Sequence, residues 1–400
     1  MRFVKYLLFF CVFIFPLHAE FISSKQQKQF EQKYSSKVVE RALNASENIW
    51  ELKSDLGLTK HELFSLCLFI ETKLSSHVKK GQLYLRKEKT KLARTIQYDP
   101  KTKRTFIHLK QHGIKRLGKG WHKVVTYSIM YSDKNPELVA NSVLELDFDS
   151  RREVSILKRL KTQRGLAKTY SITTHAKKRS KKKVVSIIQK LYNAKSLHHY
   201  QQNPKILSRE KVMHIAHDLL YGLEELHKHN LVHRDLHGGN ILVERVKGGK
   251  YNAAIIDFGQ TRRAKQAALY GPMVEVPKRF NPPDAFWRNV KTINAKAVDV
   301  YALGLNLYHL YFGVQPEWAS KPAFAKISSL SDSGKVSFRN RLLSKISYYL
   351  KKRKNSITSN QDPYTRFERL ILQMCHPKPY KRGSAREVRL KLDKILRDMN

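Results

Sequence analysis

Two short polar segments, each beside an apolar pattern, constrain the fold of this chain more than any other feature. The first is His233-Arg234-Asp235-Leu236-His237-Gly238-Gly239-Asn240, which follows a long stretch of helical periodicity. The second is Asp257-Phe258-Gly259, which follows the apolar run Ala253–Ile256. That run predicts a short buried strand with Asp257 presented at its end. Either segment alone is compatible with a structural turn, but both in this order and at this spacing indicate a functional site.

The first segment resembles the catalytic loop H-R-D-L-x-x-x-N of eukaryotic-type protein kinases. The resemblance makes Asp235 the carboxylate that orients the attacking hydroxyl and receives its proton. It makes Asn240 and Asp257 the ligands of Mg²⁺ (or Mn²⁺) on the phosphates of ATP. His237 stands where serine/threonine kinases usually carry a lysine, and in its protonated form it would donate to the γ-phosphate.

Three later segments agree with this resemblance. Asn281-Pro282-Pro283-Asp284 stands where the family has A-P-E, with aspartate in place of glutamate. Ala297–Gly304 is similar to the helix whose aspartate, here Asp299, braces the backbone of the catalytic loop. His376–Arg382 resembles a late segment of the family whose arginine pairs with the A-P-E carboxylate. The resemblance therefore implies an ion pair between Arg382 and Asp284. These segments favour protein kinases over small-molecule kinases, which lack this ending.

The order of the elements predicts an α+β, bilobal, protein-kinase-like fold over residues 113–400. A small antiparallel β lobe is expected over about 113–192 and a larger helical lobe over about 193–400. Ser208 is expected to cap a long helix of the large lobe. The expected strands are 124–131, 138–146, 167–172 and 184–189, with a helix at 150–160, and the apolar stripe of the long helix is Val212, Ile215, Leu219, Leu220, Leu223 and Leu226.

The small lobe departs from the family pattern at the residue that binds the phosphates. Ser142 stands where the family has its lysine. The glycine-rich segment contains Gly118 and Gly120, with Lys123 in place of the third glycine. This is similar to the with-no-lysine kinases, which supply the lysine from this strand, and Glu153 matches the helix glutamate that pairs with it. The alternative is that Lys123 is a solvated lysine on a very basic surface.

Other small-lobe residues are placed around the nucleotide by the same resemblance. Val125 follows the glycine-rich segment, and Gln189 stands at the gatekeeper position. Lys190-Leu191-Tyr192 resembles the linker whose backbone hydrogen-bonds the adenine, with Leu191 at its centre. Arg234-Asp235-Leu236 lacks the arginine–alanine signature of tyrosine kinases. Serine and threonine are therefore the favoured acceptors, and tyrosine stays open.

Arg234, next to the catalytic aspartate, usually accompanies an activation segment that is ordered by phosphorylation. Thr261 and Tyr270 are the candidate acceptors between Asp257 and Asp284. The alternative is that the neighbouring arginines and lysines simply make this segment a solvated basic loop.

The N-terminus has the pattern of a targeting segment. Arg2 and Lys5 precede an apolar run from Tyr6 to Leu17, which is too short to span a bilayer and typical of a signal peptide over residues 1–19. Export is the prediction, and an uncleaved membrane anchor is the alternative. Residues 20–112 are expected to form helices and a hairpin, 95–98 with 105–108, in an accessory segment. Cys67 and Cys375 lie in apolar helical patterns and are expected to be buried thiols rather than a disulfide.

The charge balance bears on the partners. The chain has 77 Lys and Arg against 33 Asp and Glu, a formal net charge of +44. Such a surface favours acidic or anionic partners, and Lys177–Lys183 and Lys351–Lys354 are candidate docking runs. No aromatic residues alternate with these lysines, so sequence-specific recognition of nucleic acid is not expected. The oligomeric state stays open.

The sequence thus predicts an exported, ATP-dependent protein kinase that phosphorylates a protein substrate, with delivery into a host cell as a hypothesis. Two alternatives belong to other classes of protein. Ser142, His237 and the missing third glycine favour a nucleotide-binding pseudokinase that acts as a scaffold. The high positive charge favours a basic docking protein on a vestigial kinase fold.

Overall fold

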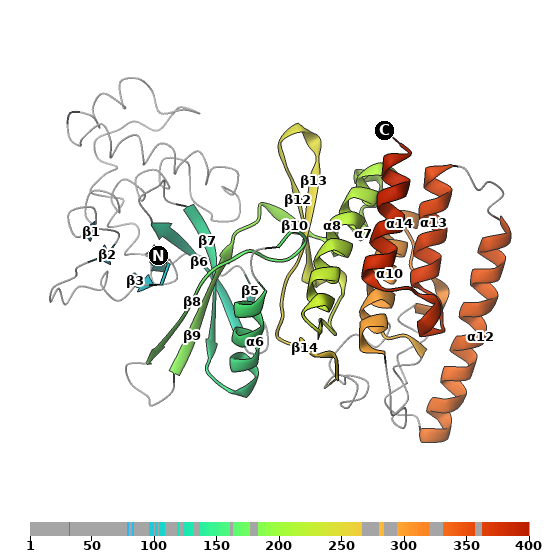
Figure 1. Cartoon of the computed structure of the whole chain (residues 1–400), viewed down its shortest axis with the longest axis horizontal. Coiled ribbons are helices and arrows are strands. Elements are labelled where there is room, and N and C mark those ends of the chain that lie inside the picture. The colour runs from blue at the N-terminus through green and yellow to red at the C-terminus, as the bar shows by residue number, and fades with distance from the viewer. Residues whose placement is uncertain are drawn as a thin grey trace. The chain divides into compact units, whose positions relative to one another are not determined.

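The computed structural model of this 400-residue chain describes residues 32, 78–79, 82–83, 96–99, 101–102, 104–108, 118–119, 123–131, 137–160, 163–176, 183–265, 280–283, 294–319, 331–356 and 362–399. They fall into two compact units. The sheet unit comprises Met1–Arg151 and Thr169–Asn193, and the helical unit comprises Arg152–Lys168 and Ala194–Asn400 (Figure 1). The predicted α+β fold, with a small antiparallel β lobe and a larger helical lobe, is confirmed. The predicted signal peptide and the helices expected in the accessory segment 20–112 lie outside the described residues, Gln32 excepted.

The sheet unit is built on one antiparallel sheet of seven strands. A short separate hairpin pairs β1 (Val78–Lys79) with β2 (Gln82–Leu83). The strands of the large sheet run in the order β3 (Ile96–Asp99), β4 (Arg104–His108), β6 (Lys123–Tyr131), β7 (Glu137–Glu145), β9 (Lys183–Lys190) and β8 (Thr169–Ala176), and β5 (Gly118–Lys119) pairs with β6.

The predicted hairpin at 95–98 and 105–108 is confirmed as β3 and β4, with Ile96 opposite Ile107. It does not stand apart, because β4 continues onto β6 with Phe106 opposite Met130. Phe106 and Met130 pack with Val139 and Ile188 in a buried cluster on one face of the sheet. The boundary predicted at residue 112 therefore falls between strands of one sheet.

The helical unit holds most of the described helices. Figure 1 shows α8, α10, α13 and α14 side by side, in agreement with the contacts between them. The helices are α6 (Phe148–Arg159, which begins in the sheet unit), α7 (Leu197–Gln202), α8 (Arg209–Lys228), α10 (Ala295–Phe312), α12 (Asp332–Ser356), α13 (Pro363–Met374) and α14 (Ala385–Arg397). The strands are β10 (Ala194–Ser196), β12 (Ile241–Arg245) and β13 (Tyr251–Ile255) in one sheet, and β11 (Leu231–Val232) with β14 (Arg262–Arg263) in another. None of the helices in the described ranges combines the length and apolar character needed to span a bilayer.

Helix α8 forms as its sequence predicts. The Ser208 side chain accepts a hydrogen bond from the backbone of Lys211, and this caps the helix. All six residues of the predicted apolar stripe are buried. On a neighbouring face, Glu224 accepts a hydrogen bond from Arg389 of α14 at 2.5 Å. Burial disfavours the charged carboxylate, but the hydrogen bonds from Arg389 and Lys228 outweigh it and lower the pKa of Glu224.

Close packing at one glycine attaches the segment after α6 to the helical unit. Gly165 has a φ of +75°, and a Cβ there would lie 2.0 Å from the backbone oxygen of Asp218. Only glycine fits both the left-handed conformation and this close approach. Ile255 of β13 donates to the Gly165 carbonyl, and Ala167 donates to the Ile255 carbonyl. The segment that follows α6 is therefore held against β13 and α8.

The buried cysteine behaves as predicted. Cys375 is a free thiol with 0% exposure, and burial raises its pKa, so it stays protonated. Cys67 lies outside the described residues.

One buried carboxylate on α10 holds the loop after β11. Asp299 accepts hydrogen bonds from the backbone N–H of His233 at 2.7 Å and of Arg234 at 2.9 Å. His227 Nε2 of α8 lies 3.1 Å from the same carboxylate. Asp299 is 1% exposed, so these partners replace water entirely. The predicted bracing of the loop by this aspartate is confirmed.

Replacing Asp299 by asparagine is expected to weaken this anchor. An amide has one acceptor oxygen and adds a donor, so one of the two backbone N–H groups, which bind different oxygens of Asp299, loses its acceptor. The free energy of unfolding should fall by about 2 kcal/mol or more, because a buried unpaired donor costs this much. Urea denaturation measures the loss. Hydrogen exchange of the His233 and Arg234 amides should accelerate relative to the rest of the unit.

The matched control is Glu210→Gln, which removes a carboxylate that is 60% exposed on α8. It should change stability by less than about 0.5 kcal/mol. Equal losses in the two variants would show that Asp299 is not the anchor.

Candidate active site

Three contacts join the two motifs singled out in the sequence. The His233 ring accepts the Asp235 N–H at Nδ1, so its Nε2 carries a proton and donates to the Ile256 carbonyl at 3.1 Å. Ile256 N donates to the Asn240 carbonyl at 2.9 Å. The His233 ring also packs edge to face against Phe258, with centroids 5.6 Å apart. The catalytic loop and the Asp257 segment therefore form one structural unit.

Strand pairing brings the predicted metal ligands to the same end of a ladder. Asn240 directly precedes β12, and Asp257 follows β13 after one residue. The two strands are antiparallel, with Ile241 opposite Ile255. The start of one strand and the end of the other consequently lie together.

The carboxylate of Asp235 is held by Asn240. The Asn240 amide nitrogen donates to the Asp235 carbonyl at 3.0 Å and to Asp235 Oδ2 at 2.9 Å. Both amide hydrogens are used in this way, which orients the amide oxygen away from Asp235. His237 Nε2 lies 3.6 Å from the other carboxylate oxygen, Oδ1. The two predicted catalytic residues thus lie beside each other, with Asp235 about one-fifth exposed.

Two residues of this site have left-handed backbone conformations. The φ of Arg234 is 69° and that of Asp257 is 64°. For a residue with a Cβ this region costs about 1–2 kcal/mol, and such strain concentrates at functional sites. Asp299 holds the Arg234 N–H, and the Asn240 carbonyl holds the residue before Asp257. The site therefore depends on tertiary contacts that keep both residues in place.

The oxygen atoms of Asn240 and Asp257 are of the ligand type that Mg²⁺ prefers. Across the described ranges, no group of three or more His, Cys, Asp or Glu residues is placed to hold a metal ion. Mg²⁺ in phosphate-transferring enzymes is usually held by one or two carboxylates together with substrate phosphates. The residues present therefore fit a magnesium–nucleotide complex better than a metal held by protein alone.

The predicted helix glutamate lies beside the second motif. Glu153 of α6 is 5% exposed. A Cβ built on Gly259 would lie 3.8 Å from Glu153 Oε2 and 3.3 Å from Asp257 Oδ1. Its neighbour Arg152 donates to the Gly259 carbonyl at 2.9 Å. Helix α6 therefore brings a carboxylate to the Asp257 segment within the helical unit.

In the sheet unit, strand register places the predicted nucleotide-binding side chains on one face. Lys123 and Val125 are two residues apart on β6, and Val125 is opposite Ser142 of β7. Ala140, two residues before Ser142, is opposite Gln189 of β9. Residues opposite each other, or two apart on one strand, point to the same side of a sheet. Lys123 thus shares a face with the position where the family has its lysine.

The remaining predicted nucleotide contacts are described in part. Gly118 lies in β5 opposite Val125, and Gly120 lies outside the described residues. Leu191 is half-buried directly after β9. Lys190 Nζ lies 4.6 Å from the centre of the Tyr192 ring, so Tyr192 packs within the linker. The roles of Gly118, Gly120 and Leu191 stay predictions.

The structure contradicts one predicted phosphate acceptor. Thr261 has 0% exposure, and its backbone N–H donates to the Phe258 carbonyl at 3.0 Å. Its hydroxyl is not accessible to another kinase in this conformation. Tyr270, the other candidate, lies outside the described residues.

The expected ion pair between Arg382 and Asp284 stays a prediction, because Asp284 also lies outside the described residues. Arg382 itself is completely buried and donates to the carbonyls of Ala297, Pro377 and His376. Its guanidinium also lies 5.0 Å from the centre of the Tyr301 ring. Arg382 therefore joins α10 to the segment that precedes α14.

Sequence reasoning missed a second support of the catalytic loop. The Asn306 amide of α10 donates to the Leu236 carbonyl at 3.2 Å, and Gln201 of α7 donates to the Asn306 amide oxygen. A Cβ on Gly238 would lie 2.6 Å from the Gln201 amide oxygen and 3.0 Å from the backbone nitrogen of His198, so a larger residue here would displace Gln201. The glycine pair in the motif was the one local sequence signal for this support. The sequence around Asn306, Gln201 and His227 gave no signal that these residues contact the loop.

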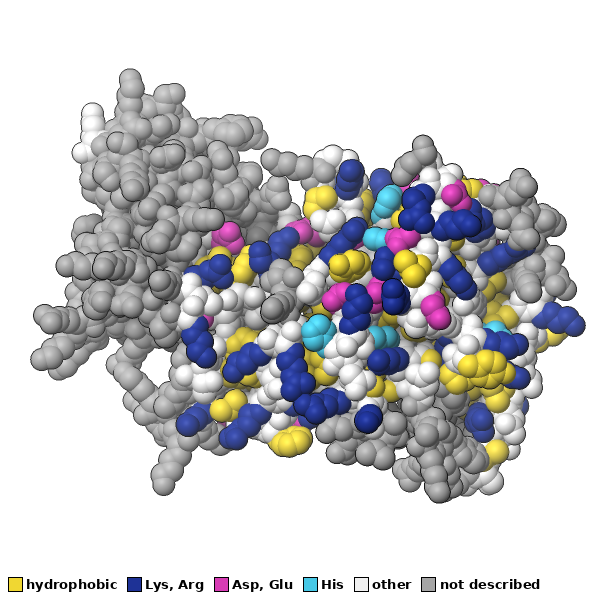
Figure 2. Space-filling model, in the orientation of Figure 1, with side chains coloured by type: hydrophobic (Ala, Val, Ile, Leu, Met, Phe, Trp, Pro, Cys, Tyr) yellow, Lys and Arg dark blue, Asp and Glu magenta, His cyan; other side chains and the backbone are white. Residues whose placement is uncertain are grey.

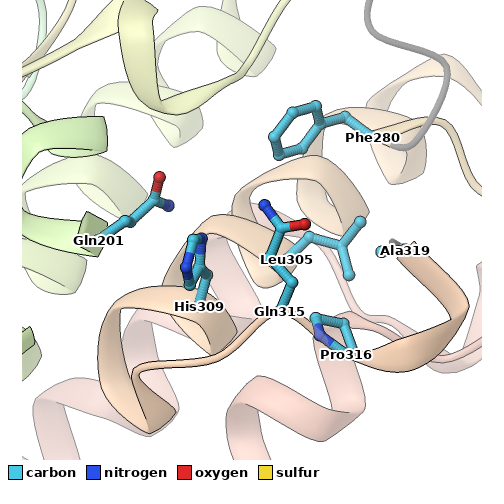
Figure 3. Close-up of a pocket in the computed structure, with 7 residues that line it drawn as sticks. All are labelled: Gln201, Phe280, Leu305, His309, Gln315, Pro316 and Ala319. Carbon is cyan, nitrogen blue, oxygen red and sulfur yellow. The ribbon is translucent and has the colours of Figure 1, made fainter. Parts of the chain in front are cut away.

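A small pocket with a volume of about 10 Å³, room for about one water molecule, shares Gln201 with this support (Figure 3). Its Phe280 ring has its centroid 6.3 Å from that of His237, and Gln201 links it to the support just described. None of its residues carries a carboxylate. The lining consists of Gln201, Phe280, Leu305, His309, Gln315, Pro316 and Ala319.

Comparison with known proteins agrees with this geometry. The chain matches the family model "Protein kinase domain" over residues 111–391. It is 32% identical over 132 residues to "Sperm motility kinase Tcr mutant form" of Mus musculus, which covers 33% of this chain and 26% of that protein. It is 27% identical over 186 residues to "Mitogen-activated protein kinase 2" of Arabidopsis thaliana, which covers 44% of this chain and 47% of that protein.

A third similarity, of 26% identity over 233 residues, is to "Putative ribosomal protein S6 kinase alpha-1" of Caenorhabditis elegans. It covers 57% of this chain and 28% of that protein. The chain thus spans between about a quarter and a half of the length of these relatives. The family model covers well over half of the chain and includes both motifs of the site. The chain therefore belongs to the protein kinase superfamily.

Proposed function

We propose that this chain is an active kinase that transfers the γ-phosphate of ATP to serine or threonine hydroxyls of a protein substrate. The observation that carries the proposal is the joining of Asp235, Asn240 and Asp257 into one unit, by the hydrogen bonds from Asn240 to Asp235 and by the contacts of Ile256. Family membership supports ATP and a divalent metal ion as the general requirements. The names of two relatives, a mitogen-activated protein kinase and a ribosomal protein S6 kinase, support a protein as the substrate.

Each residue has a distinct task in this proposal. Asp235 orients the acceptor hydroxyl and receives its proton, because Asn240 fixes its carboxylate and leaves Oδ1 toward His237. Asn240 and Asp257 would hold the magnesium ion, which neutralises negative charge on the phosphates. His237, when protonated, supplies a cation beside the acceptor hydroxyl. Lys123 supplies the phosphate-binding ammonium that Ser142 lacks.

A nucleotide-binding pseudokinase is the second candidate function. Ser142 favours it, since the lysine of the family pattern is missing at this position. The two functions differ in a single result. An active kinase transfers phosphate, whereas a pseudokinase shows only a metal-dependent rise in melting temperature with ATP.

Export is also proposed, from Arg2, Lys5 and the apolar run that follows. Delivery into a host cell would give an exported kinase access to ATP. Fractionation of the producing cells, with N-terminal sequencing of the exported form, should find the protein outside the cytosol and cleaved near Ala19. Recovery of the whole protein, uncleaved, from the cytosol would contradict export, and recovery in the membrane would indicate the uncleaved anchor.

Removal of the predicted metal ligand is expected to abolish transfer. The full chain is incubated with labelled ATP, Mg²⁺ and a generic protein acceptor, and the incorporated phosphate is measured. Asp257→Ala and Asp235→Asn should each lower the rate about a thousandfold or more, and chelation of Mg²⁺ should have the same effect. Phosphoamino-acid analysis then identifies the acceptor.

The control for this assay is Glu210→Ala, which removes an exposed carboxylate of the same unit and should leave the rate unchanged. Transfer that persists in Asp257→Ala would show that the activity comes from another protein or that the site is misassigned.

The displaced lysine gives a separate prediction. Lys123→Met should lower transfer at least about a hundredfold, because the phosphates lose a charged hydrogen-bond donor. Ser142→Ala should leave it nearly unchanged. Lys183→Met, which removes an exposed lysine at the start of β9, is the matched control. Equal rates for Lys123→Met and the parent chain would assign the phosphate contact to another residue.

A further inference from the structure

Helix α12 has two faces of opposite character. Its inner face packs through Leu342 and Ile346, which are 4% and 0% exposed. Tyr349 continues this face, with its ring 4.8 Å from that of Trp318 and its hydroxyl 2.5 Å from that of Tyr308. The spacing i, i+4 and i+7 is that of one side of a helix. This side attaches α12 to the rest of the helical unit.

The outer face repeats the same spacing one residue earlier. Arg341, Lys345, Tyr348 and Lys352 follow each other at i, i+4, i+7 and i+11, and all four are exposed. Tyr348 is 70% exposed. With a rise of 1.5 Å per residue, the stripe from Arg341 to Lys352 is about 16 Å long. It is a convex row of cations with one aromatic ring within it, and Lys351 lies at its border.

In the part of the chain that the structure describes, no carboxylate neutralises this row. The sequence of α12 contains no acidic residue after Asp332. Among the described residues, none places a carboxylate within salt-bridge distance of Arg341, Lys345, Lys351 or Lys352. Figure 1 shows α12 at the outer side of the helical unit, and Figure 2 shows Lys and Arg outnumbering Asp and Glu on the visible face. The charge on α12 is therefore available to an external anion.

We propose that the outer face of α12 docks the protein on an anionic lipid bilayer. Lysines and arginines near an anionic membrane surface are each attracted to it, and a tyrosine ring prefers the headgroup region. Because the helix is single and straight, its cations form a row, and all of them can contact a plane of lipid headgroups simultaneously. Single-stranded nucleic acid is bound instead in basic grooves with several stacking aromatics, and α12 offers one exposed ring on a convex surface.

This proposal does not depend on the proposed kinase activity. Membrane docking would place the protein among substrates at the same surface, but binding itself requires no phosphate transfer. The two can therefore be tested on the same variants, with different readouts.

The test compares binding of the full chain to phosphatidylcholine vesicles with and without phosphatidylserine, by co-sedimentation at low salt. The ratio of the two partition coefficients is the readout. It cancels binding through the apolar N-terminal run, which does not depend on lipid charge. The triple variant Lys345→Gln, Lys351→Gln and Lys352→Gln should lower this ratio about a hundredfold, or about fivefold for each lysine. Added salt should lower the ratio of the parent chain.

The matched control neutralises three exposed lysines elsewhere on the helical unit, Lys195→Gln, Lys205→Gln and Lys250→Gln. It has the same net charge as the α12 variant and should lower the ratio about threefold or less. Equal losses in the two triple variants would overturn the proposal, because they would indicate general charge attraction. An unchanged ratio in the α12 variant would also overturn the proposal. This holds even if the variant binds polyglutamate or an oligonucleotide less well than the parent chain does.

Circular dichroism and the melting temperature confirm that each variant is folded. Both triple variants should keep the parent rate of phosphate transfer to a soluble acceptor. An inactive parent chain that still distinguishes the two triple variants on vesicles would refute the proposed function and leave the docking surface intact.

Discussion

The buried carboxylate of Asp299 is the contact on which the site depends. It accepts two backbone N–H groups of the catalytic loop and lies beside His227, so α8, α10 and the loop share one anchor. A charged acceptor in a site without water holds its donors more strongly than a neutral one. This anchor allows Arg234 to keep a left-handed conformation that an isolated loop would leave. The position of Asp235 follows from it.

The second motif is held through the first. His233 and Asn240 both bind the backbone of Ile256, one through a side chain and the other through a carbonyl. Asp257 is therefore positioned by residues of the catalytic loop, and it also has a left-handed backbone. The β12–β13 ladder brings the two ends together, and α6 adds Glu153 beside them. A change at any of these contacts should shift the positions of both proposed oxygen ligands, Asn240 and Asp257.

Charged side chains are arranged differently in the candidate active site and on the outer face of α12. Within the site, few charged groups are held by short hydrogen bonds at fixed positions, which suits chemistry at one atom. On the outer face of α12, Arg341, Lys345 and Lys352 have no carboxylate partner among the described residues and are spread along an exposed surface, which suits a partner without fixed geometry. We propose that the displaced lysine joins the first kind, because β6 and β7 place Lys123 on the face of Val125 and Ser142. The same excess of lysine can therefore support both activities.

The sequence by itself determined the motifs, the hairpin of β3 and β4 and the cap and stripe of α8, because these depend on residues close together in the chain. The bracing by Asp299 came from the family resemblance. Only the tertiary structure decided that the hairpin joins the main sheet, that Thr261 is buried, and that His227, Gln201 and Asn306 support the loop. It also decided which side of α12 is exposed. Each of these depends on partners far away in the sequence, and local periodicity carries no information about which distant surfaces meet.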